Sequence, residues 1–415
     1  MIKKPPGIED IFPDKITKWN YVLETAKNIF KIYNYKEIII PLIEFTEVFA
    51  RGLGDETDIV SKEMFSFKDR GDRDLSLRPE GTASVVRALV ENGEYNRLAL
   101  NKFFYFGPMF RAERPQKGRL RQFNQFGAEL FGSDHPFHDF EVISLMNDMA
   151  KRLPIKDYEL LLNSIGCQRC RPNFILELSK YYESHYDQLC QECQRRLKKN
   201  PLRLLDCKNK DCQKLKEDAP KISSFLCQDC QDHHAEVKKY LDSAQIDYQD
   251  DFNLVRGLDY YNKTTFEFVT KALGGQNAFA AGGRYDNLVE QFGGKPTPAI
   301  GFAAGLERIL LLLDDLTIDS VALDAFLIHS GGKTLEIALE IVNFLRQNNI
   351  SVDLDPVNTN FKPQFKRADR EKAKIAIIIG EEELEKGIFS VKNLISGTQQ
   401  KIVRSELIEF FKKNF

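Results

Sequence analysis

Apolar and polar residues alternate most clearly between positions 101 and 132, where they predict two strands joined by a loop. One face of this strand pair carries every second residue, namely Phe103, Tyr105, Gly107, Met109, Arg111, Arg121, Phe123, Gln125, Gly127 and Glu129. Burying charged groups without partners is costly, so the row of Arg, Gln and Glu indicates a ligand-binding face. A solvated polar face at a sheet edge is the other interpretation of this pattern.

Further helical and strand periods occur up to residue 315. Helices are predicted at 14–34 and 138–152, a helix plus a strand within 51–68, and an extended segment followed by a helix across 75–90. Strands are predicted at 37–40, where Pro41 ends the strand, at 156–166, at 276–282, and across 248–270 with an interruption at 256–261. A strand, glycine turn and helix are predicted across 297–315. The stretch 167–240 is lysine-rich and helical in pattern, so it is predicted to be an insertion.

The remaining residues alternate between strand and helix after a linker at 314–320. Strands are predicted at 324–329, 351–354 and 375–379, and helices at 335–347, 361–372 and near 405–413. This order predicts a small α/β domain. A chain of 415 residues also exceeds one ordinary core, which predicts two or three domains.

Glu80 and Arg308 each lie near the start of a predicted helix. The helix after Glu80 is predicted to begin at Gly81 or Thr82. Glu80 is either a first-turn carboxylate that favours the helix dipole or a ligand for a cationic amine. Arg308 is either a solvated helix residue or an anion ligand. The pattern alone leaves both pairs of interpretations open.

Positive charge is local in this chain, because the formal net charge is −2. The loop between the two strands carries Arg114, Lys117 and Arg119 against Glu113. The segment 362–374 has six basic residues against two acidic ones, which suits contact with phosphates. A solvated helix face explains the second segment nearly as well.

The eight cysteines all fall within 64 positions, in the pairs Cys167/Cys170, Cys190/Cys193, Cys207/Cys212 and Cys227/Cys230. The N-terminal residues lack the apolar core of a secretory signal, so disulfides are disfavoured and thiolate metal binding becomes the default. Two four-cysteine zinc sites would use every cysteine. The alternative is a small module that only packs its thiols.

Composition narrows the class of protein further. Hydrophobic residues make up 42% and aromatic residues 11% of the chain, as in folded globular proteins. No apolar run approaches the roughly 18 residues that span a membrane. We therefore expect a soluble, cytoplasmic protein without a membrane partner.

Several segments resemble one family when they are taken together. They are Pro41 after a strand, LRPEGT, GPMFRAERPQKGRLRQFNQFG, LVRGLDYY (254–261), GGRYDNLV (282–289), GLER before an apolar helix, and VKNL within 387–399. These segments resemble the three motifs of class II aminoacyl-tRNA synthetases, and the finer match is to the histidyl-tRNA synthetase family. The resemblance spans nearly the whole chain.

The resemblance implies an α/β (α+β) chain with a class II catalytic domain at 1–322 built on an antiparallel sheet. It also implies a helical, cysteine-rich insertion at 167–245, close to the tRNA acceptor arm, and a mixed α/β anticodon-binding domain at 323–415. The expected activity is ATP-dependent activation of L-histidine followed by transfer to tRNA(His). The first motif around Pro41 implies a homodimer, and Mg²⁺ is expected with ATP.

The resemblance also assigns site residues. Histidine-binding residues would be Glu80, Gly81, Thr82, Arg111, Gln125, Glu129, Arg256, Tyr260, Tyr261 and Tyr285. ATP-binding residues would be Arg111, Arg119, Arg121, Arg256 and Arg308, with Arg111 and Arg256 as the catalytic residues. Gln116 and Lys117 would contact the tRNA.

A non-catalytic relative is the competing interpretation. A regulatory subunit of histidine biosynthesis resembles the catalytic domain of this family, and it would lack the C-terminal domain and some ATP-facing arginines. Here residues 323–415 are present, and so are Arg111, Arg256 and Arg308. These features favour the synthetase.

Overall fold

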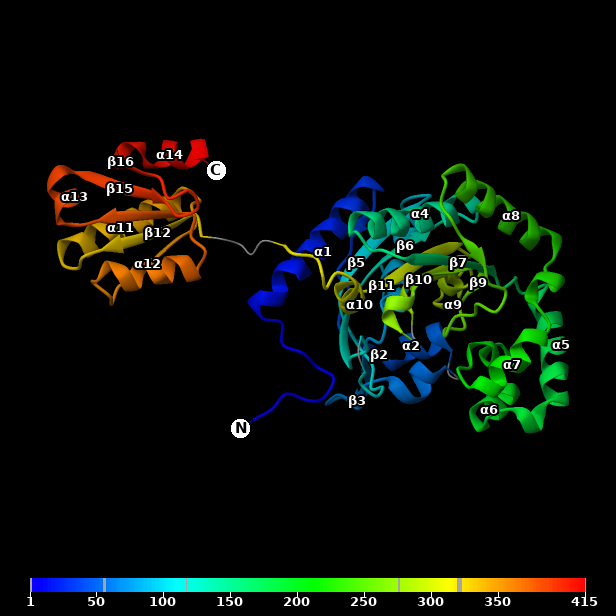
Figure 1. The fold of residues 1–415 in the computed structure, drawn as a ribbon. Helices are drawn as coiled ribbons and strands as arrows, with labels where there is room; N and C mark the ends of the chain where they lie inside the picture. Colours follow the sequence, from blue (N-terminus) through cyan, green and yellow to red (C-terminus); the bar gives the residue numbers. More distant parts are fainter. Residues whose placement is uncertain (1, 55–56, 117, 275–276, 319–322, 415) are drawn as a thin grey trace. The chain divides into compact units, whose positions relative to one another are not determined.

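The computed structural model describes residues 2–54, 57–116, 118–274, 277–318 and 323–414 (Figure 1). The chain divides into two compact units, Met1–Leu316 and Thr317–Phe415, which are described separately. Among the described residues, none of the helices has the length and apolar content needed to cross a bilayer.

An eight-stranded sheet forms the centre of the first unit. Its strands, in spatial order, are β1 (Lys36–Glu37), β5 (Asn101–Phe110), β6 (Gln122–Phe131), β11 (Ala299–Gly305), β10 (Ala278–Arg284), β9 (Asn262–Thr270), β7 (Tyr158–Ser164) and β8 (Gln249–Asp250). The inner pairs are antiparallel, whereas β1 and β8 pair in parallel at the two edges. The predicted strand pair is β5 and β6, whose register runs unbroken from Asn101 opposite Phe131 to Phe110 opposite Gln122.

Helices cover one face of this sheet (Figure 1). They are α1 (Pro13–Ile32), α4 (Pro136–Arg152), α8 (Gln228–Ser243) and α10 (Leu306–Leu312). Phe30 of α1 is fully buried and stacks on Phe104 of β5 with ring centroids 4.6 Å apart. Phe126 and Leu130 of β6 point into the same core, so the alternate residues of β6 must face the opposite side.

The opposite face carries shorter elements. They are α2 (Thr46–Leu53), α3 (Thr82–Glu91), α9 (Leu288–Gln291), the helical turns at Ile59–Glu63 and Glu94–Asn96, and a small sheet of β2 (Ile43–Phe45), β4 (Asp74–Leu77) and β3 (Ser66–Lys68). The turn Lys271–Leu273 belongs to the first face, where Leu273 packs against the core. Tyr105, Met109 and Tyr285 belong to this second core. The predicted alternation of the strand pair β5 and β6 is therefore confirmed. Its Gln and Glu residues lie on the face that carries these shorter elements.

The cysteine-rich stretch between β7 and β8 folds into a helical group of its own (Figure 1). It contains α5 (Arg171–Ser184), α6 (Gln191–Lys199), α7 (Lys210–Asp218) and the short helices Tyr186–Gln188, Pro201–Asp206 (η4) and Ile222–Phe225. Phe174, Leu178 and Tyr182 of α5 form its core together with Cys193 and Cys212. Helix α8 then returns the chain to the large sheet.

The second unit is a five-stranded mixed sheet with helices. Its strands, in spatial order, are β13 (Val352–Leu354), β12 (Ala325–His329), β14 (Ile375–Ile379), β15 (Ile388–Asn393) and β16 (Gln399–Val403). Its helices are α11 (Lys333–Gln347), α12 (Phe361–Arg370), α13 (Glu381–Lys386), the turn Arg404–Glu406 and α14 (Leu407–Asn414). The first three strands are parallel and the last two antiparallel.

The predicted fold class is confirmed, with an antiparallel-dominated sheet, a helical group within it and a mixed α/β unit after it. Two details differ. The strand predicted at 37–40 is only two residues long, because Ile38 makes the last backbone bond to Phe104 before the chain turns away. The segment 381–403 holds α13, β15 and β16, which the sequence pattern did not predict.

Candidate active site

A cavity of about 620 Å³ opens on the sparsely covered face of the large sheet, and residues of the helical group form part of its wall. Most of the predicted site residues line it, namely Glu80, Thr82, Arg111, Arg119, Gln125, Arg256, Tyr260, Tyr261 and Arg308. These residues come from segments up to 228 positions apart, from Glu80 to Arg308. The fold thus gathers these nine residues into one concave site, whereas Glu129 and Tyr285 are buried and are not among the residues that line it.

Glu129 is fully buried on β6, among hydroxyl groups. Thr82 Oγ1 donates a hydrogen bond of 2.7 Å to Glu129 Oε1, Tyr105 donates to the same oxygen at 3.4 Å, and Tyr285 donates to Glu129 Oε2. Burial raises the pKa of Glu129 to about 8, against the opposing effect of the hydrogen bonds from Tyr285 and Thr82. The carboxyl group therefore holds its proton at neutral pH until a partner favours the charged form.

Gly301 of β11 lies opposite Glu129 in the register of the sheet. A Cβ atom at Gly301 would overlap Glu129 Oε2 and the backbone oxygen of Ala128. The absence of a side chain at this position is therefore what leaves room for the Glu129 carboxyl group.

Glu80 and Gln125 form a polar corner near Glu129. The buried Glu80 carboxylate accepts hydrogen bonds from the backbone N–H groups of Thr82, at 2.7 Å, and Ala83, at 2.8 Å, in the first turn of α3. It thus acts as the first-turn carboxylate and lines the cavity as well. Gln125 Oε1 is buried and has no hydrogen-bond partner among the described residues, so a donor on a ligand would satisfy it.

Arg111, Arg119 and Arg308 form one basic side of the cavity. Arg111 Nε donates to Pro79 O at 3.1 Å, and its guanidinium group lies 5.3 Å from the ring centroid of Phe123. Arg119 Nη1 pairs with Glu113 at 2.6 Å, and Arg308 Nε donates to Gly118 O at 3.3 Å. Burial lowers the pKa of Arg308, and the neighbouring Arg119 lowers it further.

Arg256 is the basic group contributed by the loop between β8 and β9. Its Nη1 forms an ion pair with Glu267 of β9, and its guanidinium group lies 5.8 Å from the ring centroid of Tyr261. Burial lowers the pKa of Arg256, but the Glu267 carboxylate outweighs burial and holds this pKa above the ordinary value. Its Nε is buried without a partner among the described residues.

Other predicted residues lie outside the cavity wall. Gly81 packs on Tyr105 behind Thr82, and a Cβ there would overlap the tyrosine ring. Arg121 instead donates from Nε to Glu113 O at 3.3 Å. Gln116 is exposed and bridges to Arg119 through backbone bonds of 3.0 and 2.8 Å. Lys117 lies outside the described residues.

Several carboxylates of the cavity were missed by sequence reasoning, namely Glu63, Glu113, Glu267 and Glu307. Glu267 is a lone charged residue within the otherwise apolar strand segment TTFEFVT, and that isolation was a usable signal. Glu307 accepts hydrogen bonds from the backbone and side chain of Asn124 at 2.9 and 3.0 Å, which ties the start of α10 to β6. No spacing rule connects residues so distant in sequence.

Comparisons with known proteins agree with this geometry. The sequence profile described as histidyl-tRNA synthetase matches residues 7–309, and the profile described as anticodon binding domain matches residues 324–414. The chain belongs to the histidyl-tRNA synthetase family. The family resemblance inferred from the sequence is thus confirmed.

Members of this family match the chain over nearly its full length. It is 48% identical over 415 residues to the histidine–tRNA ligase of Halothermothrix orenii, with 99% of each chain covered. It is 46% identical over 403 residues to that of Natranaerobius thermophilus, with 96% of each covered. The crystal structure of apo S. aureus histidyl-tRNA synthetase is 37% identical, with a TM-score of 0.85 over 99% of this chain and 100% of that one.

The cysteines of this family member gather into two groups of four. Cys167, Cys170, Cys227 and Cys230 form the first cluster, and Cys190, Cys193, Cys207 and Cys212 form the second. Within each cluster all four sulfur atoms lie within 4.8 Å of one another, and none is in a disulfide. Cys207 of the second cluster also lines the active-site cavity.

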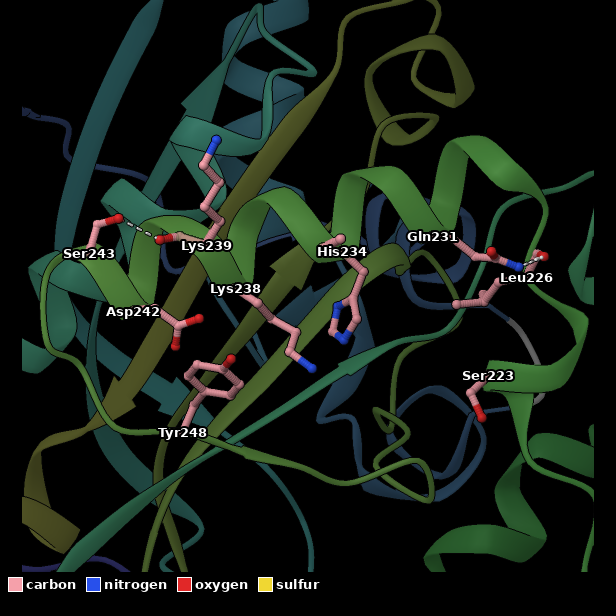
Figure 2. A pocket seen from close by; sticks show the side chains of 10 residues that line it. Ser223, Leu226, Gln231, His234, Lys238, Lys239, Asp242, Ser243 and Tyr248 are labelled. Carbon is pink, nitrogen blue, oxygen red and sulfur yellow. Dashed lines mark hydrogen bonds between the residues drawn. The ribbon is translucent and has the colours of Figure 1, made fainter.

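A separate hollow of about 550 Å³ runs along α8 (Figure 2). Lys238 lies over the ring of Tyr248, 5.6 Å from its centroid, and pairs with Asp250 at 2.5 Å. His234 Nε2 also contacts Asp250 at 3.3 Å. No residue assigned from the family motifs lines this hollow, so the candidate active site is the cavity on the other face.

Proposed function

We propose that this chain is a histidine–tRNA ligase, which activates L-histidine with ATP and transfers the histidyl group to tRNA(His). Its membership of an aminoacyl-tRNA ligase family supports this activity. The single observation that carries the amino-acid specificity is the buried Glu129 carboxyl group with its three hydroxyl donors.

Recognition of histidine would use both ends of the amino acid. Glu129 and Tyr261 would hydrogen-bond the imidazole ring, and Tyr260 and Tyr285 would shape the pocket around it. Glu80, Thr82 and Gln125 would bind the α-amino group, and the unpartnered Gln125 Oε1 supports this assignment. A wrong amino acid would leave Glu129 without its ligand partner, and such sites reject analogues by about 10⁴–10⁵-fold without editing.

Activation joins two anions. The histidine carboxylate attacks the α-phosphorus of ATP and expels pyrophosphate, so negative charge builds on the phosphate oxygens. Arg111 and Arg256, on different segments of the cavity wall, would neutralise this charge from two sides without reorganising. Arg308 would hold the γ-phosphate, with Arg119 and Arg121 nearby. Bidentate geometry favours Arg over Lys in these positions.

Mg²⁺ accompanies ATP in this class of enzyme. Carboxylate oxygens are the ligands that Mg²⁺ prefers, and Glu113 and Glu267 place such oxygens in the same cavity as the arginines. The ion would supply charge neutralisation on the phosphates, and Glu113 or Glu267 would have to leave its partner, Arg119 or Arg256, to hold it. Because the histidine carboxylate is itself the nucleophile and pyrophosphate the leaving group, no protein nucleophile is required.

Transfer to tRNA would involve both units of the chain. The exposed Gln116 and its neighbour Lys117 would contact the acceptor end. The basic segment 362–374 of the second unit would contact phosphates of the anticodon arm, consistent with the anticodon-binding profile over 324–414. We propose domain boundaries of 1–322 for the catalytic domain, 167–245 for the insertion and 323–415 for the anticodon-binding domain.

The test of the activity is histidine-dependent ATP–pyrophosphate exchange on the purified chain. Exchange that requires L-histidine, and that other amino acids at the same concentration do not support, is the expected result. The absence of exchange above background would contradict the proposed activity. The competing regulatory subunit would give no exchange, but the relatives of 42–48% identity are ligases and the arginines expected of a ligase are all present.

We further propose that each cysteine cluster binds one zinc ion. Tetrahedral Zn–S bonds of about 2.3 Å separate the sulfur atoms by about 3.8 Å. The sulfur atoms lie 3.7 Å apart for Cys167 and Cys170, 3.8 Å for Cys167 and Cys227, and 3.8 Å for Cys190 and Cys207. Bound zinc would fix the helical group structurally, since its four ligands leave no open position.

A homodimer and a cytoplasmic location complete the proposal. Large apolar side chains are exposed around the first motif, including Ile39 at 91%, Phe45 at 51% and Phe67 at 43%. A second copy of the chain would cover them. Sedimentation of the full chain at twice the monomer mass is the expected result. Eight cysteines without disulfides suit the reducing cytoplasm.

A further inference from the structure

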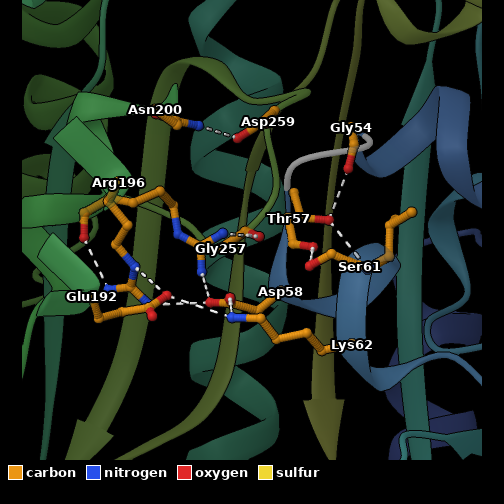
Figure 3. A network of polar contacts seen from close by, with 12 residues as sticks. Gly54, Thr57, Asp58, Ser61, Lys62, Glu192, Arg196, Asn200, Gly257 and Asp259 are labelled. Atoms are coloured by element: carbon orange, nitrogen blue, oxygen red, sulfur yellow. Dashed lines mark hydrogen bonds and ion pairs between the residues drawn. The ribbon is translucent and has the colours of Figure 1, made fainter. Parts of the chain in front are cut away.

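Asp58 joins the catalytic core to the helical group (Figure 3). It lies directly before the helical turn Ile59–Glu63, and its Oδ2 accepts hydrogen bonds from Arg203 Nη2 at 2.7 Å and Arg196 Nη2 at 3.1 Å. Lys62 Nζ contacts the other oxygen at 3.3 Å. One carboxylate thus holds two arginines that lie 138 and 145 positions further along the chain.

The same segment of the helical group also contacts the loop that carries Arg256. Arg203 Nη1 donates to Gly257 O at 3.5 Å, and Asn200 Nδ2 donates to Asp259 Oδ1 at 2.7 Å. The backbone N–H of Asp259 in turn donates to Leu53 O at 3.2 Å. The loop 256–259 is therefore held from two sides, by α2 and by the segment 200–203.

Two carboxylates and three cationic side chains form the network around Asp58. Facing it are Lys62 on its own turn, and Arg196, Arg203 and Glu192 on the helical group. Glu192 Oε1 lies 3.5 Å from Lys62 Nζ and 3.6 Å from Arg196 Nε. Burial opposes ionisation of Asp58, but Arg203, Lys62 and Arg196 outweigh it and lower the pKa of this carboxyl group. The network remains intact at physiological pH.

The two arginines lie between the metal-ligand candidates of the second cluster. Arg196 on α6 and Arg203 on η4 both fall between Cys193 and Cys207. Arg203 is only 11% exposed and Arg196 is 21% exposed, and each contacts the Asp58 carboxylate within 3.1 Å. Paired and largely buried guanidinium groups are poor anchors for an RNA phosphate, which favours a role inside the protein.

We propose that Asp58 and Arg203 are positioning residues for amino-acid activation, because they hold the helical group against the loop 256–261 and so place Arg256, Tyr260 and Tyr261. This proposal rests on the proposed ligase activity. Both residues line the cavity, where they hydrogen-bond to one another and Arg203 also donates to the Gly257 backbone oxygen. The helical group therefore supports the activation site already in the absence of tRNA, because it fixes one side of the loop 256–261.

The test uses full-length Asp58→Asn and Arg203→Gln in the ATP–pyrophosphate exchange assay, which contains no tRNA. Each variant is expected to lower kcat at least tenfold with less than a threefold change in the KM for ATP. The double variant is expected to be no worse than the single ones, because the two residues act as one pair. Asp58→Glu keeps the charge and is expected to recover most of the lost kcat.

Two variants serve as matched controls. Asp72→Asn lies at an exposed turn position with a φ of 59°, which Asn adopts readily. Arg195→Gln lies next to Arg196, but the Arg195 side chain is 69% exposed. Both are expected to match the wild type. Hydrogen exchange of peptides covering 254–261 gives a second readout, and it is expected to accelerate in Asp58→Asn and Arg203→Gln only.

Two results would overturn the proposal. The first is unchanged hydrogen exchange at 254–261 in both variants. The second is wild-type pyrophosphate exchange with a raised KM for tRNA in aminoacylation, which would make Arg203 a tRNA contact. If the wild-type chain itself catalyses no exchange, the ligase activity fails, and the hydrogen-exchange comparison still tests the contact between Asp58 and Arg203.

Discussion

The hydroxyl group of Thr82 donates a hydrogen bond of 2.7 Å to Glu129, which connects residues 47 positions apart. The bond joins the first turn of α3 to the middle of the sheet. The hydrogen bonds to this carboxyl group, among the described residues, come from hydroxyl groups alone. Burial therefore dominates, and the protonation of Glu129 becomes the property through which pH acts on the site.

The first prediction concerns histidine capture. With the pKa of Glu129 at about 8, kcat/KM for histidine is expected to rise with pH and to level off above pH 8, because the ionised carboxylate is the stronger acceptor for an imidazole N–H. Glu129→Gln should remove this inflection and lower kcat/KM for histidine roughly 10- to 100-fold. The KM for ATP should change little, and an equal loss for both substrates would contradict the assigned role.

The second prediction concerns stability. The pKa of Glu129 is about 8 in the folded chain against 4.5 as its ordinary value, so between these values the folded state holds a proton that the unfolded state has released. Glu129 therefore contributes most stability below pH 4.5, and this contribution is lost as pH rises through 8. Urea unfolding should show Glu129→Gln exceeding the wild type by about 1 kcal/mol or more at pH 9, with near equality at pH 5.

The third prediction separates charge from geometry at Arg256. Arg256→Lys keeps the positive charge but loses the planar guanidinium group, which can donate two parallel hydrogen bonds to a phosphate. The kcat for pyrophosphate exchange is therefore expected to fall roughly 10²–10³-fold. Arg97→Lys is the matched control, because Arg97 is 69% exposed in a surface ion pair with Glu94. Comparable losses in the two variants would argue against a special role for Arg256.

The fourth prediction tests a buried ion pair behind the active site. Arg284 and Asp139 are both 0% exposed, and Arg284 Nε lies 3.1 Å from Asp139 Oδ2. His233 of α8 contacts the same carboxylate at 3.0 Å. Asp139→Asn leaves the buried guanidinium group with Asp286 as its remaining counterion, at 3.0 Å from Nη1, so the free energy of unfolding is expected to drop by about 3 kcal/mol in urea titrations. A drop below 1 kcal/mol would contradict this account.

The fifth prediction concerns metal content. Wild-type protein, dialysed against a weak chelator, is expected to retain two zinc ions per chain by elemental analysis. Cys207→Ser and Cys230→Ser, one in each cluster, should each retain one. Removal of all zinc with a strong chelator should lower the melting temperature, because the small helical core alone is marginal. Zinc-free wild-type protein with an unchanged melting temperature would refute both sites.

The strand period carried most of the information about the site. A period of two residues was sufficient to place Gln125 and Glu129 on one face, because an unbroken antiparallel register leaves no other choice. Arg121 shares that period but lies at the end of the loop, where the backbone bond to Gly7 and the contact with Glu113 redirect it. The two-residue period predicts the direction of a side chain only where the residue belongs to paired strands.

Contacts between distant segments could not be predicted from local patterns. Nothing in the sequence around Asp58 indicates that its partners are Arg196 and Arg203, since the relation depends on how a helical group folds back on a loop. The cysteine spacing predicted tetrads but left open which pairs combine, and the structure joins the first pair with the last. Strand β16 escaped prediction because it is a largely exposed, mostly polar edge strand. Strand β15 lies inside the sheet and buries Phe389 and Val391, but its apolar stretch is too short to show a clear period.

Gly301 has a consequence for attempts to change the amino acid that the site accepts. The Glu129 carboxyl group of β6 occupies the space that a side chain at position 301 of the neighbouring strand β11 would fill. A smaller residue at 129 would remove the overlap with the carboxyl group, but a Cβ at 301 would still lie 2.5 Å from the backbone oxygen of Ala128. Redesign of the specificity must therefore keep glycine at 301 and vary position 129 against it.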